Sequence, residues 1–364
     1  MTESEPSSRD EQEAGTFQAT PPSRGGDSPE FRERALAWFR FALPGQSVEI
    51  ETLEMPKANG FSAETFLFGL KVDGALRRYV LRRDPVDNAL FVGLDNSHQA
   101  TVIAALHAAR NVPVPAILGE ERDPSVLGSP FFVMEHVDGR IPPDNPPYSI
   151  SGWVSALSAG DRERLWWSAI EAMSGMAAFD WREAGLGHLL RGAPGQNGLE
   201  WEFEYYLKLY RDHADGVQET FISEAARWVE KNMPAEDQLT LSWGDARLGN
   251  IIFQGTDCAA LIDWEQSTIG AVERDLGWWF FNDSYWHEGI GASRNAGWPS
   301  HAETEQYYAN LVGKPLKDVG FYKAFATFRG AVSMARVTAL GMLPDMPIDD
   351  FPPARLFKAT VSSL

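Results

Sequence analysis

The chain has 364 residues, 44% of them hydrophobic, and a formal net charge of −19 at pH 7. This length and apolar content suffice for a sizeable buried core in one large domain or two lobes. The acidic balance leaves no basic excess to neutralise a phosphate backbone, which argues against a nucleic-acid partner, and the lack of any eighteen-residue apolar run argues against a membrane span.

The first 30 residues are predicted to form a disordered acidic tail. They contain seven acidic and two basic residues and almost no large apolar side chain, so they cannot bury enough surface to offset the cost of ordering. Order is expected from Ser28, a suitable cap for a helix over residues 31–41. The tail lacks the apolar core of a secretory signal, and Cys258 is the sole cysteine, so we expect a reducing, cytoplasmic location without an intrachain disulfide.

A β-rich first lobe is predicted over residues 31–137. Its strands are expected at 64–72, 76–83 and 130–137, and a helix is expected at 97–110. Asp73-Gly74 between the first two strands is a hairpin signal, because Asp and Gly tolerate the backbone conformations of a tight turn.

A mostly helical second lobe is predicted over residues 138–364. Ser158, with Asp161 three residues later, is expected to cap a helix whose apolar residues follow the 3.6-residue period. Further helices are predicted at 199–215, 218–232 and 318–340, and short strands at 239–242 and 259–262. The chain is therefore expected to adopt an α+β, bilobal fold.

The strongest chemical signal is the segment LSWGDARLGNIIF at residues 241–253, followed by ALIDWE at residues 260–265. Phosphoryl transfer needs a carboxylate to orient the attacking hydroxyl and oxygen ligands for the metal ions that bridge the phosphates. Asp245 and Asn250 have the D-x-x-x-x-N spacing of a kinase catalytic loop, and Asp263 ends a short apolar strand thirteen residues later. An ordinary turn explains any one of these residues alone, but the ordered set favours phosphoryl transfer.

These segments, together with ERDLGWW at residues 273–279, resemble the aminoglycoside phosphotransferase family within the protein-kinase-like fold. The chain is most similar to a branch that includes the kinase domains attached to some acyl-CoA dehydrogenases. The resemblance implies that Asp245 is the catalytic base, that Asn250 and Asp263 hold Mg²⁺, and that ATP is the phosphate donor. The family motif has a His, commonly an orienting residue, where this chain has Trp243.

The same resemblance implies nucleotide contacts at Arg82, Gln99 and Ser62 in the first lobe. Residues 79–85 (YVLRRDP) resemble the strand that carries the phosphate-binding Lys, and Arg82 stands in its place. Arg keeps its charge and can donate two hydrogen bonds to a phosphate, although a surface Arg on an edge strand is the alternative. Gln99 stands where the acidic partner of that Lys is expected, and Ser62 lies in the segment that replaces the nucleotide-covering loop.

The strand FFVMEHVDG resembles the adenine-binding linker between the lobes of a kinase. In that register Met134 lines the adenine pocket, while the carbonyl of Glu135 and the amide of Val137 bind the base. An ordinary apolar strand that ends in a turn has almost the same sequence.

Two further acids flank this predicted centre. Asp275 resembles the family's buried acid near the start of the following helix, with an expected structural role in bracing the catalytic loop. Glu265 follows Asp263 by two residues and is interpreted either as a residue supporting the metal ligands or as a solvated acid.

The leading hypothesis is an ATP- and Mg²⁺-dependent kinase that phosphorylates a hydroxyl of a small molecule. The branch resemblance favours a hydroxylated metabolite or acyl thioester as the acceptor, and an aminoglycoside or macrolide is the alternative. Aromatic residues between Trp201 and Tyr210, or between Trp278 and Trp286, are candidates for the acceptor pocket. The replacement of the usual Lys and Glu by Arg82 and Gln99 motivates a second class, a nucleotide-binding pseudokinase that acts as an interaction module. The sequence gives no indication of oligomeric state.

Overall fold

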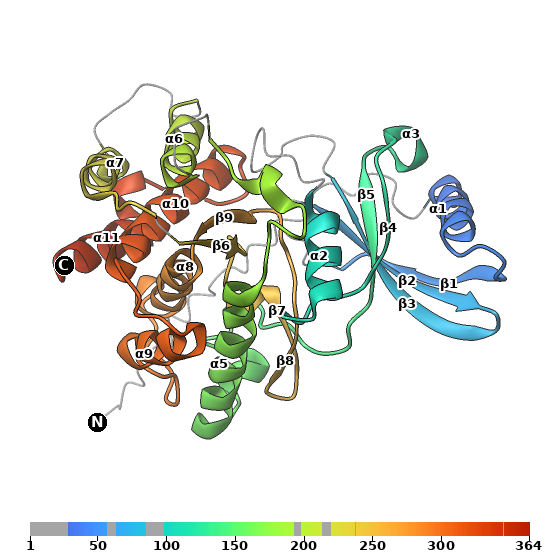
Figure 1. Ribbon diagram of the computed structural model, residues 1–364, viewed down its shortest axis with the longest axis horizontal. Coiled ribbons are helices and arrows are strands. Elements are labelled where there is room, and N and C mark those ends of the chain that lie inside the picture. Colours follow the sequence, from blue (N-terminus) through green and yellow to red (C-terminus); the bar gives the residue numbers. More distant parts are fainter. Residues whose placement is uncertain are drawn as a thin grey trace, which may run out of the picture.

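The computed structural model describes residues 28–56, 63–84, 98–192, 198–212, 220–236, 238–344 and 346–364. It has a β-rich part and a mostly helical part, side by side along the long axis of the molecule (Figure 1). The predicted α+β, bilobal, protein-kinase-like fold is confirmed. The exact limits of the two lobes remain a prediction, and most of the predicted tail lies outside the described residues.

The first lobe is an antiparallel five-stranded sheet with three helices. Its sheet has the order β1-β2-β3-β5-β4. The elements are α1 (Pro29–Ala42), β1 (Val48–Glu54), β2 (Glu64–Val72), β3 (Ala75–Arg83), α2 (His98–Ala109), β4 (Ile117–Glu121), α3 (Pro124–Leu127) and β5 (Phe131–Glu135). Ser28 caps α1 as predicted, because its Oγ accepts a hydrogen bond of 3.1 Å from the amide of Phe31.

The predicted hairpin between β2 and β3 is present. Val72 pairs with Ala75, and the two turn residues Asp73 and Gly74 have φ angles of 49° and 84°. Positive φ at both central residues is the signature of the turn that matches the twist of antiparallel strands. The hairpin sets Arg82 of β3 opposite Thr65 of β2, and on its other side β3 pairs with β5, where Arg82 lies opposite Phe132.

The second lobe contains eight α-helices and two short antiparallel strand pairs within its described residues. The helices are α4 (Gly152–Ser155), α5 (Ala159–Ser174), α6 (Gly198–Arg211), α7 (Phe221–Asn232), α8 (Glu273–Ser284), α9 (His301–Val312), α10 (Val319–Ala339) and α11 (Pro352–Val361). The strands β6 (Leu239–Ser242) and β9 (Thr268–Ala271) pair with each other, as do β7 (Ile251–Gln254) and β8 (Asp257–Leu261). Ser158 caps α5 through the amide of Asp161.

Helices α8 and α10 form the centre of this lobe and lie close together behind the strand pairs (Figure 1). Glycines allow this close approach. A Cβ at Gly277 of α8 would lie 2.5 Å from the carbonyl carbon of Tyr322 in α10, and a Cβ at Gly330 of α10 would lie 2.3 Å from the ring of Phe281 in α8. None of the helices in the described ranges is both long and apolar enough to cross a membrane.

Candidate active site

Two loops of the second lobe meet at the edge of the strand pairs. One connects β6 to β7 and contains Asp245 and Asn250, and the other follows β8 and contains Asp263. The amide of Ile262 donates to the carbonyl of Asn250 at 3.0 Å, which joins the two loops directly. The structure therefore brings together the three residues that the sequence motif singles out.

Trp243 ties the same two loops together through its side chain. It is fully buried, and its indole Nε1 donates to the carbonyls of Ile262 at 3.0 Å and Asp263 at 3.1 Å. Asp263 itself has a φ of 63°, a left-handed conformation that is uncommon outside glycine and that Asp adopts more readily than most residues. Trp243 is thus an orienting residue in the position where the family motif has His.

Asp275, at the start of α8, braces the first loop as predicted. Its carboxylate accepts hydrogen bonds from Ser242 Oγ at 3.0 Å and from the amides of Trp243 and Gly244, both at 2.8 Å. Burial raises the pKa of Asp275, although these donors act in the opposite direction. Gly244 has a φ of 87°, and a Cβ there would lie 2.1 Å from the carbonyl oxygen of Gln266, so only glycine fits this turn.

The carboxylate of Asp245 receives three hydrogen bonds from other side chains. Oδ1 accepts from the indole Nε1 of Trp278 at 2.7 Å, and Oδ2 accepts from Asn250 Nδ2 at 2.7 Å and from Arg247 Nε at 3.1 Å. Arg247 also contacts Asp144 at 2.6 Å. Although burial opposes its charge, the two carboxylates raise the pKa of Arg247, which therefore stays protonated.

Asn250 and Asp263 provide oxygen atoms suited to a hard divalent cation such as Mg²⁺. Both hydrogen bonds recorded for the Asn250 side chain leave from Nδ2, toward the backbone oxygen and the carboxylate of Asp245, so the amide is oriented with its oxygen away from Asp245. Among the described residues there is no group of three His, Cys, Asp or Glu that could hold a metal alone. The donor set therefore fits a metal that takes its remaining ligands from phosphate and water.

The first-lobe candidates have different surroundings. Arg82 forms an ion pair with Asp263, with 3.3 Å between Nη2 and Oδ1, so it faces the second lobe. Gln99, expected as its partner, is buried in α2, and Ser62 lies outside the described residues. Glu265 is only 5% exposed, which contradicts its interpretation as a solvated acid.

The three predicted adenine contacts lie at the end of β5. Met134 is buried and pairs with Val80, while Glu135 is the last residue of the strand and is exposed. The amide of His136 still donates to the carbonyl of Arg78 at 3.0 Å, so Val137 is the first residue beyond the sheet.

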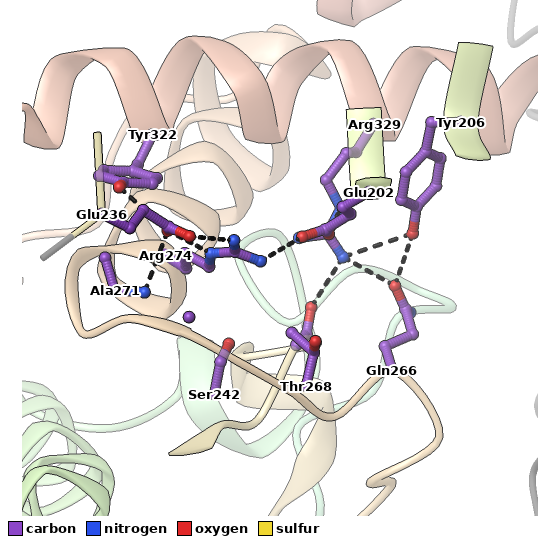
Figure 2. Close-up of polar contacts among 12 residues, drawn as sticks. Glu202, Tyr206, Glu236, Ser242, Gln266, Thr268, Ala271, Arg274, Tyr322 and Arg329 are labelled. Atoms are coloured by element: carbon purple, nitrogen blue, oxygen red, sulfur yellow. Dashed lines mark hydrogen bonds and ion pairs between the residues drawn. The ribbon is translucent and has the colours of Figure 1, made fainter. Parts of the chain in front are cut away.

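A network of buried charges connects the helices of the second lobe to the Asp245 loop (Figure 2). Arg274 of α8 pairs with Glu236 at 2.5 Å and with Glu202 of α6 at 2.7 Å, and Glu202 also pairs with Arg329 of α10 at 3.1 Å. Arg329 then donates to the carbonyl of Gly244 at 3.0 Å, directly before Asp245. The charges of the two arginines and two glutamates balance, as buried ions require.

Beside this network, α6 borders a shallow recess that is partly open to solvent, here called the α6 recess; its volume of about 20 Å³ is enough for about one water molecule. Trp201 and Tyr205 stack along one side with 5.5 Å between ring centroids, and the guanidinium of Arg191 lies 5.0 Å from the Trp201 ring centre. The remaining lining residues are Glu202, Tyr206, Gln266, Thr268 and Arg329. Glu202 and Arg329, which belong to the network of buried charges, thus also line the recess.

Sequence reasoning assigned no role to Arg247 and Arg329, and it named Trp278 only among the aromatic candidates for the acceptor pocket. Arg247 carries a local signal, since it lies within the catalytic-loop motif, two residues after Asp245. Trp278 and Arg329 are 33 and 84 residues from Asp245, and only the packing of α8 and α10 brings them to the loop.

Comparison with known proteins identifies this arrangement. The family model described as "Phosphotransferase enzyme family" matches residues 56–310. Among curated proteins, a probable acyl-CoA dehydrogenase, IBR3, of Arabidopsis thaliana is 28% identical over 75% of this chain and 34% of that protein. Acyl-CoA dehydrogenase family member 11 of Gallus gallus is 35% identical over 54% of this chain and 24% of that protein. The chain thus spans about a third or less of the length of these relatives.

Solved structures share the fold. A Ralstonia eutropha protein assigned as an aminoglycoside phosphotransferase has a TM-score of 0.68 and 24% identity, covering 90% of this chain and 95% of that one. An aminoglycoside phosphotransferase, APH(4)-Ia, solved with AMP-PNP and hygromycin B, has a TM-score of 0.54 and 15% identity, covering 86% and 95% of the two chains.

Proposed function

Because the chain belongs to the phosphotransferase enzyme family and is a phosphotransferase that acts on hydroxyl groups, we propose that it transfers the γ-phosphoryl group of ATP to a small molecule. Asp245 is the proposed general base, and Asn250 and Asp263 are the proposed metal ligands. The observation that carries this proposal is the direct contact between the two loops that bear these residues.

In the proposed reaction, Asp245 accepts the proton of the acceptor hydroxyl as its oxygen attacks the γ-phosphorus. A bond forms between that oxygen and phosphorus, the bond from phosphorus to the bridging oxygen breaks, and ADP leaves with the electron pair. Arg82 binds the phosphates of ATP. To do so, it gives up the ion pair that it forms with Asp263 in the present structure. Asn250 and Asp263 would hold Mg²⁺, which would supply positive charge against the phosphates. Met134, Glu135 and Val137 are the proposed adenine contacts.

The proposed acceptor is a hydroxylated, largely apolar metabolite, with a hydroxyacyl thioester as the first candidate. The curated relatives named as acyl-CoA dehydrogenases support this choice, whereas the aminoglycoside phosphotransferase structures are less than 25% identical. The stacked rings of Trp201 and Tyr205 on α6 support it as well, because an aromatic surface suits an apolar group.

Labelled ATP with Mg²⁺ and a panel of hydroxyacyl thioesters, hydroxy acids, sugars, macrolides and aminoglycosides tests the proposal. We expect label transfer to an acyl thioester or hydroxy acid, and loss of more than 99% of it in Asp245→Ala, since general acid–base catalysis alone contributes about 10²–10⁴-fold. Exposed Asp257 of β8 provides the control Asp257→Ala, which should transfer label normally. Transfer that survives in Asp245→Ala rejects the role of the base.

The same assay separates a kinase from a pseudokinase. A kinase converts ATP to ADP slowly even without an acceptor, with water in its place, and Asp263→Asn should abolish this conversion. Binding of ATP without any turnover in the wild-type protein would identify a nucleotide-binding module instead.

A further inference from the structure

The hydrogen bonds of Asp245 leave a single direction for an incoming hydroxyl. An ionised carboxylate has about four acceptor positions, two on each oxygen. Oδ2 already accepts from Asn250 at 2.7 Å and from Arg247 at 3.1 Å, so both of its positions are used. Within the part of the chain that the structure describes, Oδ1 accepts only from Trp278, at 2.7 Å, so it retains one.

We infer that the acceptor hydroxyl binds Oδ1 of Asp245 next to the indole N–H of Trp278, and that Trp278 is a positioning residue for the reaction. This inference rests on the proposed function. Trp278 holds the carboxylate at one fixed rotation, so that the remaining position on Oδ1 faces the acceptor. Because the indole and the hydroxyl share one oxygen atom, the edge of the indole also forms part of the wall that the acceptor carbon contacts.

Arg329 fixes Trp278 in turn. Its guanidinium lies 4.4 Å from the centre of the Trp278 ring, a distance at which a cation and an aromatic face attract each other. The same guanidinium donates to Gln266 Oε1 at 2.8 Å (Figure 2). It also donates to the carbonyl of Gly244 at 3.0 Å and pairs with Glu202. The buried side chain of Arg329 therefore contacts both Gly244, the residue before Asp245, and Trp278, which orients the Asp245 carboxylate.

Arg329 also links Trp278 to α6. Its guanidinium lies 5.1 Å from the ring centre of Tyr206, and Arg329 and Tyr206 both line the α6 recess.

The adjacent tryptophan provides a matched control. Trp279 is buried and packs edge-on against Trp166, but its indole N–H has no hydrogen-bond partner within the part of the chain that the structure describes. Trp278→Phe and Trp279→Phe remove the same N–H from neighbouring positions of one helix, and both keep an aromatic ring. Only the first removes a hydrogen bond to Asp245.

Turnover of saturating Mg²⁺-ATP with water as the acceptor gives the first measurement. We expect kcat of Trp278→Phe to fall about 10- to 100-fold, the range for a lost hydrogen bond to a charged group, while KM for ATP stays within about twofold. Trp279→Phe should keep both constants. Equal kcat values for the two variants would overturn the inference.

Indole NMR signals of the ¹⁵N-labelled protein give a second measurement that does not depend on activity. The signals of Trp278 and Trp279 are identified by their loss in the two Phe variants. In Asp245→Ala the Trp278 signal should move and the Trp279 signal should not, and an unmoved Trp278 signal would overturn the inference. A wild-type protein that turns over no ATP would reject the proposed function, while this signal still tests the contact.

Discussion

Removing the carboxylate of Asp275 should destabilise the protein strongly and also slow its reaction. Each hydrogen bond to a charged acceptor contributes about 1.5–3 kcal/mol. Asp275 accepts three, from Ser242 Oγ and from the amides of Trp243 and Gly244, and in Asp275→Ala all three buried donors lose their partner. Because burial of the carboxylate itself opposes folding, we expect a net loss of about 3–5 kcal/mol rather than the full sum.

Asp275→Asn should cost less, about 2 kcal/mol, because one oxygen remains. In the wild-type protein Oδ1 accepts from Ser242 and Gly244, and Oδ2 accepts from Trp243. If the Asn side chain keeps its oxygen toward Ser242 and Gly244, its NH₂ group faces the amide of Trp243. The hydrogen bond from Trp243 is then replaced by a contact between two donors.

Urea unfolding followed by circular dichroism measures these losses, with Asp257→Asn in the exposed end of β8 as the control. The expected order of midpoints is wild type and Asp257→Asn highest, Asp275→Asn lower and Asp275→Ala lowest. At a temperature where all variants are folded, ATP turnover should fall in the same order, because the two amides hold the backbone next to Asp245. A midpoint for Asp275→Ala equal to that of Asp257→Asn would refute the bracing role.

Three further predictions follow from single residues. Trp243→Phe removes the donor to the Asp263 carbonyl and should lower the unfolding free energy by about 1 kcal/mol in urea titrations, while an unchanged value would exclude the orienting role. Burial raises the pKa of Cys258 to about 12, so iodoacetamide at pH 8 should label it slowly in the native protein and quickly in urea; equal rates would refute this. Burial of Asp283 favours its neutral form, but the imidazole of His287, 3.3 Å from Oδ1, and the donors His301 and Arg294 on Oδ2 hold its pKa below the ordinary value. Its carboxylate therefore stabilises the fold above about pH 4 and loses this effect as the pH falls, so Asp283→Asn should lower urea midpoints more at pH 7 than at pH 3, and the reverse would contradict the assignment.

Several features could be predicted from the sequence because they depend on interactions between residues close together in the chain. The cap at Ser28, the turn at Asp73-Gly74 and the cap at Ser158 depend on residues within a few positions of each other, and all three are present. The strand 239–242 was predicted with its observed bounds, because a short apolar run ends at a glycine-containing turn. Spacing alone also identified Asp245, Asn250 and Asp263 as one set.

Several elements were not predicted, among them α9, although the capping box of Ser300 and Glu303 marks its start. Strands β1, β4, β7 and β9 and helices α9 and α11 received no assignment from the sequence, although the structure contains them. Residues Thr268–Ala271 of β9 are only a four-residue run that contains Gly270, and they form a strand because β6 offers them a partner. The pairing of Arg82 with Asp263 across 181 residues has the same long-range origin.

The sequence by itself determined the family and the bilobal fold, and it singled out the residues proposed to carry the chemistry, because phosphoryl transfer needs particular side chains at short, fixed spacings. Only the tertiary structure decided how Asp245 is oriented. Trp278 and Arg329 reach the loop through the packing of α8 against α10, where glycines let the two helices approach. No local pattern encodes a contact between residues so far apart in the chain, and the direction in which the acceptor reaches the base depends on such contacts.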